Sequence, residues 1–215
     1  TVVERNRKNE FDKELYLKFG SLGVLWQTVK THGGSGTSNL AYGLVAYEFE
    51  KIDSSYRSSI SVQSSLVIHP INEFGSQEQK DKYLPQLIKG EKIGCFGLTE
   101  SEAGSDPASM KTSFKKTKDG YILNGSKNWI TNAPIADLFI IWAIEENKDH
   151  KSIKGFIIEK NTEGLNTSTI ENKTSLKISP TGQIILNNVF VPSNLCLENT
   201  EGWKSVFSCL NKARF

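Results

Sequence analysis

The amino-acid sequence predicts an α+β fold in which helices and strands are segregated along the chain. Apolar residues recur at a helical period in the first ninety residues, short apolar runs typical of strands follow Gly94, and a helical pattern returns after Gly202. We therefore expect a helical domain over residues 1–93, a β domain over 94–200 and the start of a further helical domain over 201–215. Because no Gly-x-Gly-x-x-Gly sequence follows a predicted strand, a dinucleotide-binding βαβ unit is not supported.

The bulk composition is that of a globular chain. Its 215 residues are 37% hydrophobic and 23% charged with a net charge of +2, which fits one large domain or two smaller ones. The longest apolar run, residues 138–144, is far shorter than the roughly 20 residues that cross a bilayer. The interspersed charges offer no basic face to nucleic acid. Three widely spaced cysteines predict neither a disulfide framework nor a metal site and favour an intracellular compartment.

Capping residues mark the expected helices. Ser38 precedes a helix whose apolar residues recur every three to four positions. These residues are Leu40, Leu44, Val45, Phe49 and Ile52. Ser76 and Gln79 form a capping box before a helix that Gly90 ends. Between these helices, residues 56–71 mix apolar and small hydroxyl side chains, as a buried helix beside a ligand does.

The β domain opens with the stretch GCFGLTESEAGSDPAS at residues 94–109, which predicts a loop rich in hydrogen-bond donors. Asp119-Gly120 and Asn124-Gly125 predict two turns around a short strand, and so a hairpin. Three further runs rich in apolar and β-branched residues are expected to be strands: 137–144, 155–160 and 182–192.

Three segments carry a resemblance to a known family. GCFGLTESEAGSDP (94–107), NGSKNWITN (124–132) and NKARF (211–215), in that order and spacing, resemble the acyl-CoA dehydrogenase family. Residues 41–71 and 75–100 resemble the glutaryl-CoA dehydrogenase subfamily. The resemblance implies an N-terminal helical domain, a β-barrel-like middle domain and a C-terminal helical bundle that only begins here. The chain is therefore expected to be about the first half of a subunit.

The resemblance implies FAD as the cofactor. A flavin must lie flat against the substrate and needs hydrogen-bond donors where charge develops on its ring. The Thr99 hydroxyl would face the pyrimidine ring, Gly104 and Ser105 would allow close approach of FAD and CoA, and Trp129 would cover one ring face beside Thr131. The cofactor-binding residues implied are Phe96, Gly97, Leu98, Thr99, Gly104, Ser105, Trp129, Ile130 and Thr131. Taken alone, the first motif also suits a plain turn and Trp129 a core position.

The resemblance makes Arg57 the specificity determinant. An arginine in an apolar helix is costly without an anion, and its guanidinium binds a carboxylate with two hydrogen bonds, so the free carboxylate of glutaryl-CoA is a suitable partner. From the residues alone, a surface arginine paired with Asp53 or Glu50 is the alternative. The substrate-binding residues implied are Arg57, Ser58, Ser105, Phe207, Ser208, Leu210, Asn211 and Arg214. For the last five, an amphipathic helix ending in a cation is the alternative.

The implied activity is α,β-dehydrogenation of glutaryl-CoA with decarboxylation to crotonyl-CoA, a step of lysine and tryptophan degradation. Electrons would pass to an electron-transferring flavoprotein, and the enzyme would be a homotetramer in the mitochondrial matrix or the bacterial cytoplasm. A dehydrogenase of another short-chain or dicarboxylic acyl-CoA is one alternative, and a flavin- or CoA-binding module without catalysis is another.

No catalytic residue is assigned within the sequence. The family's glutamate base would lie beyond Phe215. His32, His69 and His150 show no nucleophile–base arrangement and are expected to be structural or at the surface. Ser101 stands where the family usually has proline, which leaves the conformation of the first motif open.

Overall fold

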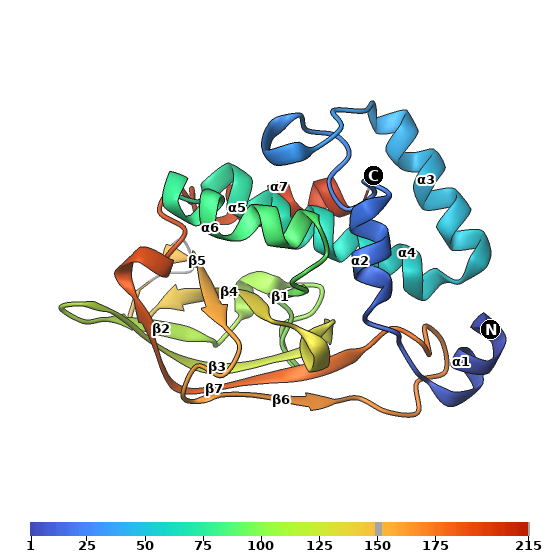
Figure 1. Ribbon diagram of the computed structural model, residues 1–215. Coiled ribbons are helices and arrows are strands. Elements are labelled where there is room, and N and C mark those ends of the chain that lie inside the picture. The colour runs from blue at the N-terminus through green and yellow to red at the C-terminus, as the bar shows by residue number, and fades with distance from the viewer. Residues whose placement is uncertain (149–151, 215) are drawn as a thin grey trace.

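The structure is a computed structural model that describes residues 1–148 and 152–214, so His150 and Phe215 lie outside the described residues. Helices come first and strands follow, and one helix, α7 (Trp203–Arg214), comes after the strands. In Figure 1 the helices form a layer over a curled β-sheet. Within the described ranges, no helix is both long enough and apolar enough to cross a membrane.

The helical domain is built around one long central helix. Its elements are α1 (Val2–Lys8), α2 (Leu15–Ser21), α3 (Asn39–Ile52), α4 (Ser54–Ser61), a π-helical segment (Val62–Ile68), α5 (His69–Phe74) and α6 (Gln77–Ile88). The capping predictions are confirmed. Ser38 accepts a hydrogen bond from the Ala41 N–H, Ser76 and Gln79 form a complete capping box, and Gly90 follows α6 with φ +73°.

The central helix runs without a break through α4, the π-helical segment and α5, because both junctions keep helical φ and ψ. The N–H of His69 donates to the Ser64 carbonyl, five residues back. The wide turn comes just before Pro70, which has no N–H and would clash with the carbonyl four residues earlier in a regular α-helix. Most of this helix is buried, as the sequence predicts for residues 56–71.

The apolar residues of α3 do not all reach the core. Val45 and Phe49 pack against it, but Leu40, Leu44 and Ile52 are more than half exposed. The predicted helix is therefore confirmed, but only part of its apolar stripe is buried.

The strands form a curled half-barrel. They are β1 (Gly94–Gly97), β2 (Ser113–Lys116), β3 (Gly120–Thr131), β4 (Leu138–Glu145), β5 (Lys154–Glu159), β6 (Leu165–Thr169) and β7 (Thr181–Pro192). Their order is β1-β4-β2-β3-β7-β6, and β5 pairs with the other edge of β4. β4 runs parallel to β1 and β2, whereas β2–β3, β3–β7 and β6–β7 are antiparallel. The predicted β domain is confirmed, and its closure is partial.

Two sequence predictions about the β domain were wrong. The first was that residues 94–97 belong to a loop: they form the buried strand β1, in which Phe96 pairs with Ile140 of β4. The second was a turn at Asn124-Gly125. Here β3 continues through a bulge, where Gly125 has φ +142° and Asn124 accepts a hydrogen bond from the Asn188 N–H at 2.8 Å. Only the Asp119-Gly120 turn, between β2 and β3, is confirmed.

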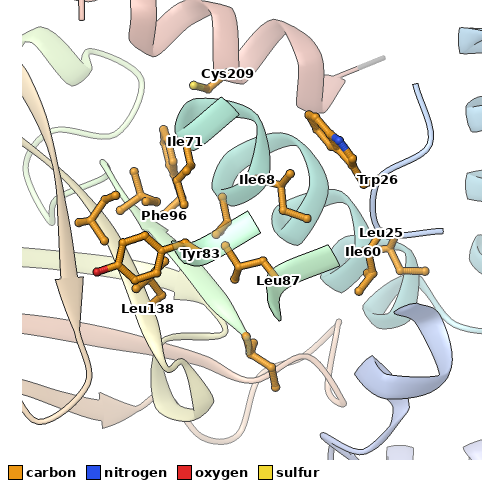
Figure 2. Close-up of a cluster of buried hydrophobic side chains, with 14 of the residues drawn as sticks. Leu25, Trp26, Ile60, Ile68, Ile71, Tyr83, Leu87, Phe96, Leu138 and Cys209 are labelled. Atoms are coloured by element: carbon orange, nitrogen blue, oxygen red, sulfur yellow. The ribbon is translucent and has the colours of Figure 1, made fainter. Parts of the chain in front are cut away.

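One hydrophobic core joins the two domains. It includes Ile68 and Ile71 of the central helix, Leu87 of α6, and Phe96 of β1. Figure 2 shows these side chains together with Cys209, which comes from α7. A second cluster fills the inside of the half-barrel. The shared core fixes the central helix and α7 beside the end of β1, where the first motif continues.

Candidate functional site

A cavity of about 160 Å³ lies where the central helix, β1, β3 and α7 meet. Its lining residues are Val62, Leu66, Phe96, Leu98, Thr99, Trp129, Ile130, Thr131 and Leu210. The two sequence motifs therefore meet in space, as predicted, and α7 adds one predicted substrate residue. Val62 and Leu66 were missed, although they follow Ser58 at successive steps of four, which is a helical spacing that could have revealed them.

Asn128 joins the two motifs at the rim of the cavity. Its N–H donates to the Thr99 carbonyl at 2.9 Å, and its Nδ2 donates to the Ser101 hydroxyl at 3.1 Å. Ser101 thus provides an acceptor that the family's usual proline side chain would lack. Both bonds fix the middle of the first motif against the start of Trp129-Ile130-Thr131.

Trp129 has an unusual backbone for an aromatic residue. Its φ is +59°, its N–H donates to Asn128 Oδ1 at 2.9 Å, and its side chain is 60% exposed at the cavity. A positive φ at a bulky residue costs on the order of 1–3 kcal/mol and is found most often at functional sites. The indole is therefore not a core residue, and its exposed flat face suits a planar ligand.

Thr99 and Thr131 supply the polar groups of the cavity. Among the described residues, neither hydroxyl makes a hydrogen bond to another protein group. Val62, Leu66 and Leu210 make the rest of the lining apolar. A flat aromatic wall, an apolar floor and free hydroxyls fit a ring system with one polar edge, as a flavin has.

Three predicted cofactor residues do not line this cavity. Gly97 is buried in β1, where an added Cβ would lie 2.6 Å from Ile141 Cδ1 and 3.2 Å from Lys127 Cγ. Its small size therefore serves packing inside the half-barrel. Gly104 and Ser105 are exposed on the loop after β1, and a Cβ on Gly104 would meet nothing within 4 Å.

Arg57 lies on α4, one turn and a residue before Val62. Its Nε donates to Glu50 Oε2 of α3 at 2.9 Å, and its side chain is 39% exposed. The pairing with Glu50 that the residues alone suggested is therefore present, while Asp53 caps α4. A hydrogen bond from Ser54 and the bond from Arg57 hold the pKa of Glu50 below its usual range. Arg57 does not line the cavity, and half-buried Ser58 lies four residues before Val62.

The predicted substrate-binding residues of α7 lie in three different environments: the cavity, the contact with the central helix, and the exposed surface. Leu210 reaches the cavity. Ser208 instead faces the central helix, with its hydroxyl 3.0 Å from His69 Nε2, and burial lowers the pKa of that histidine. His69 is thus a structural contact, as expected. The remaining members are exposed: Phe207, Asn211 and Arg214.

The helical domain, the half-barrel and the cavity between them form a two-domain unit of the acyl-CoA dehydrogenase type. The N-terminal domain model of acyl-CoA dehydrogenase matches residues 1–91, and the middle domain model matches residues 95–189. The chain therefore belongs to the acyl-CoA dehydrogenase family. Among the described residues, no group of three or more His, Cys, Asp or Glu is placed to hold a metal ion.

Relatives of more than one substrate class are similar to this chain. A short-chain-specific acyl-CoA dehydrogenase from Megasphaera elsdenii is 37% identical over 100% of this chain and 58% of its own length. Mitochondrial isovaleryl-CoA dehydrogenase from Pongo abelii is 38% identical over 88% of this chain and 46% of its own. A glutaryl-CoA dehydrogenase structure from Mycobacterium smegmatis in complex with FADH2 has a TM-score of 0.93 and 41% identity, over 97% of this chain and 53% of that one. The chain spans about half the length of these proteins.

Proposed function

We propose that the full-length protein is an FAD-dependent acyl-CoA dehydrogenase. The support is the cavity itself, which joins both family motifs around a flat, exposed indole and two free hydroxyls. The similar structure from Mycobacterium smegmatis, which holds FADH2, agrees with this proposal. FAD, when bound, supplies the acceptor for the substrate's β hydride.

Residues of this chain would bind the flavin ring and keep water away from the reacting atoms. Trp129 would cover one face of the ring, and Thr99 and Thr131 would donate hydrogen bonds to its polar edge. Val62, Leu66 and Leu210 exclude water from the reacting end of the acyl chain. No residue that lines the cavity is a carboxylate. The family resemblance implies a glutamate outside this sequence as the base that removes the α proton.

We propose glutaryl-CoA as the substrate and crotonyl-CoA and CO₂ as the products. One observation carries this choice: Glu50 contacts only the Nε of Arg57, and among the described residues neither Nη group has a partner. Glu50 therefore orients the guanidinium and leaves its fork free for a second carboxylate. The similarity to a short-chain-specific relative supports a short-chain acyl-CoA, such as butyryl-CoA, as the second candidate.

Turnover of two substrates by the full-length protein separates these candidates. Arg57→Gln is expected to lower kcat/KM for glutaryl-CoA about 100-fold, the effect of losing a charge pair worth about 3 kcal/mol. The same change should leave butyryl-CoA turnover within about threefold, because that chain carries no carboxylate.

Arg5→Gln is the matched control, because Arg5 pairs with Asp12 at 2.8 Å and is 37% exposed on α1. It should change neither substrate's kcat/KM. Equal losses for both substrates in Arg57→Gln, or no loss for glutaryl-CoA, would show that Arg57 does not read the carboxylate.

The partners are proposed on the family resemblance. We propose a homotetramer that passes its electrons to an electron-transferring flavoprotein, as expected from the sequence. Light scattering of the full-length protein measures the first, and reduction of that flavoprotein during turnover measures the second.

A further inference from the structure

A charged side chain crosses the inside of the half-barrel directly beneath the cavity. Lys127 of β3 is fully buried, with its Nζ 3.0 Å from the Leu98 carbonyl and 2.8 Å from Glu100 Oε1. Met110 Sδ lies 3.8 Å away. The stem of Lys127 passes Gly97, where a Cβ would come within 3.2 Å of its Cγ. The glycine of the first motif therefore makes room for the lysine of the second.

Glu100 closes the loop that follows β1. Its Oε2 accepts a hydrogen bond from the Lys111 N–H at 2.7 Å, and its Oε1 accepts one from the Thr112 N–H at 3.0 Å. A backbone bridge between Glu100 and Ala103 holds the near end of the loop. The Glu100 carboxylate thus binds the lysine from β3 and the far end of the 101–111 loop.

The distance of 2.8 Å between Lys127 Nζ and Glu100 Oε1 is that of an ion pair. Burial lowers the pKa of Lys127 to about 8, and Glu100 opposes that shift. Burial would raise the pKa of Glu100, but Lys127 and the hydrogen bonds from Lys111 and Thr112 outweigh burial and lower it. A buried ion pair adds little net stability compared with apolar residues of the same size, because both charges lose their hydration. Stability of the fold therefore does not account for this pair.

The contacts of Lys127 lie next to the groups that face the cavity. Leu98, whose carbonyl it binds, lines the cavity and precedes Thr99. On β3, Lys127 is two residues before Trp129, and Asn128 between them binds the Thr99 carbonyl. A shift of Lys127 would therefore move the Thr99 hydroxyl relative to the indole of Trp129.

We propose that Lys127 and Glu100 are positioning residues whose buried ion pair joins the two motifs and sets the spacing between Thr99 and Trp129 that a flat ring requires. The proposal rests on the proposed function, since it takes the ring to be a flavin. Neither residue lines the cavity, so they act through Leu98, Thr99 and Trp129.

The test compares two double variants of the full-length protein. Lys127→Met with Glu100→Gln removes the buried pair while keeping side-chain volume and an oxygen acceptor for one of the two N–H groups, those of Lys111 and Thr112. Lys111→Met with Glu102→Gln is the matched control, because it removes a 2.7 Å pair on the same loop whose side chains are both 78% exposed.

Two measurements are made on each variant. In the cofactor-free protein, amide hydrogen exchange over residues 98–102 and 126–131 should become at least about tenfold faster in the buried-pair variant. At saturating FAD, the fluorescence of the bound flavin should rise, because the indole no longer stacks squarely on the ring, and the Kd for FAD should increase at least about tenfold. The control should match the unmodified protein in both.

A folded buried-pair variant with unchanged exchange and unchanged flavin fluorescence would overturn the proposal. If that variant fails to fold, Glu100→Gln alone carries the test, with a smaller change of about threefold expected in the Kd and an unchanged Kd contradicting it. If the unmodified protein binds no FAD, the proposed function fails, and the exchange measurement still decides whether the pair positions the two motifs.

Discussion

Trp129 is the residue on which the candidate site depends most directly. Because its side chain is 60% exposed, Trp129→Ala should leave the free energy of unfolding nearly unchanged. The loss of ring stacking should raise the Kd for FAD at least about tenfold, which is ~1.4 kcal/mol. Trp129→Phe, which keeps a flat ring, should restore most of the affinity. Equal affinities for FAD in the unmodified protein and in Trp129→Ala would show that the indole does not contact the flavin.

Substitution by alanine should affect stability very differently at Gly125 and at Gly104. Gly125 has φ +142°, and its added Cβ would lie 2.7 Å from the Thr112 Cα, so Gly125→Ala should destabilise the protein by about 2–3 kcal/mol. Gly104→Ala should change the stability very little, since its Cβ would meet nothing. Urea unfolding of both variants measures the difference, and a similar midpoint for the two would contradict the bulge geometry.

The cavity residues differ in how far the sequence predicts them. Trp129 and Thr99 could be placed because each belongs to a motif whose spacing is specific. Val62 and Leu66 carry no motif, and their role arises only because a helix from another domain packs over the end of β1. Lys127 belongs to the second motif, but the sequence does not reveal its role, because a buried lysine is rare and its partner lies 27 residues away.

At the scale of elements, Gln63 ties the π-helical segment to its neighbours. Its Nε2 donates to the Leu87 and Lys92 carbonyls at 3.0 and 2.9 Å, and its Oε1 accepts from the Gly94 N–H at 2.9 Å. Gln63→Met would leave the Lys92 carbonyl and the Gly94 N–H without this partner, while the Leu87 carbonyl keeps the Gly90 N–H at 3.2 Å. We therefore expect a loss of about 2–4 kcal/mol in thermal or urea unfolding.

The control for Gln63 is Gln86→Met on α6, which removes one exposed hydrogen bond to the Lys82 carbonyl. Its effect should stay within about 0.5 kcal/mol. If Gln63→Met is no more destabilising than Gln86→Met, the amide does not hold the central helix against β1.

Helices whose ends carry capping residues could be predicted from the sequence, whereas the short strand β1 could not. Ser38, Ser76 and Gly90 mark helix ends through their own backbone chemistry, so their effect is visible in the sequence. β1 has four residues, two of them glycine, and becomes a strand only by pairing with β4, more than forty residues later. At Asn124-Gly125, a hydrogen bond between the Asn124 side chain and Asn188 favours a bulge over a turn, and that partner lies 64 residues later.

At the scale of the whole molecule, Glu159 links the two domains, and we expect this contact to make the stability of the protein depend on pH in the acid range. This β5 carboxylate accepts hydrogen bonds from Lys82 at 2.9 Å and Tyr83 at 2.6 Å, both on α6, and these bonds lower its pKa. Its contribution to stability is therefore present above the unfolded glutamate pKa of about 4.3 and is lost as the pH falls through the lower folded value.

Glu159→Gln should accordingly weaken the dependence of Tm on pH below about pH 5. Glu102→Gln is the control, because its pair with Lys111 is exposed on one loop and is screened by solvent. An unchanged pH dependence in Glu159→Gln would mean that this contact does not join the domains in solution.

A crystal structure of the full-length protein with FAD tests the central claim most directly, namely that the two motifs enclose a flavin site at the junction of the domains. We expect the ring to lie against Trp129, with its polar edge at Thr99 and Thr131 and the central helix at Val62 and Leu66 closing the cavity. A flavin ring bound elsewhere, with Trp129 and both threonines free of it, would contradict the account.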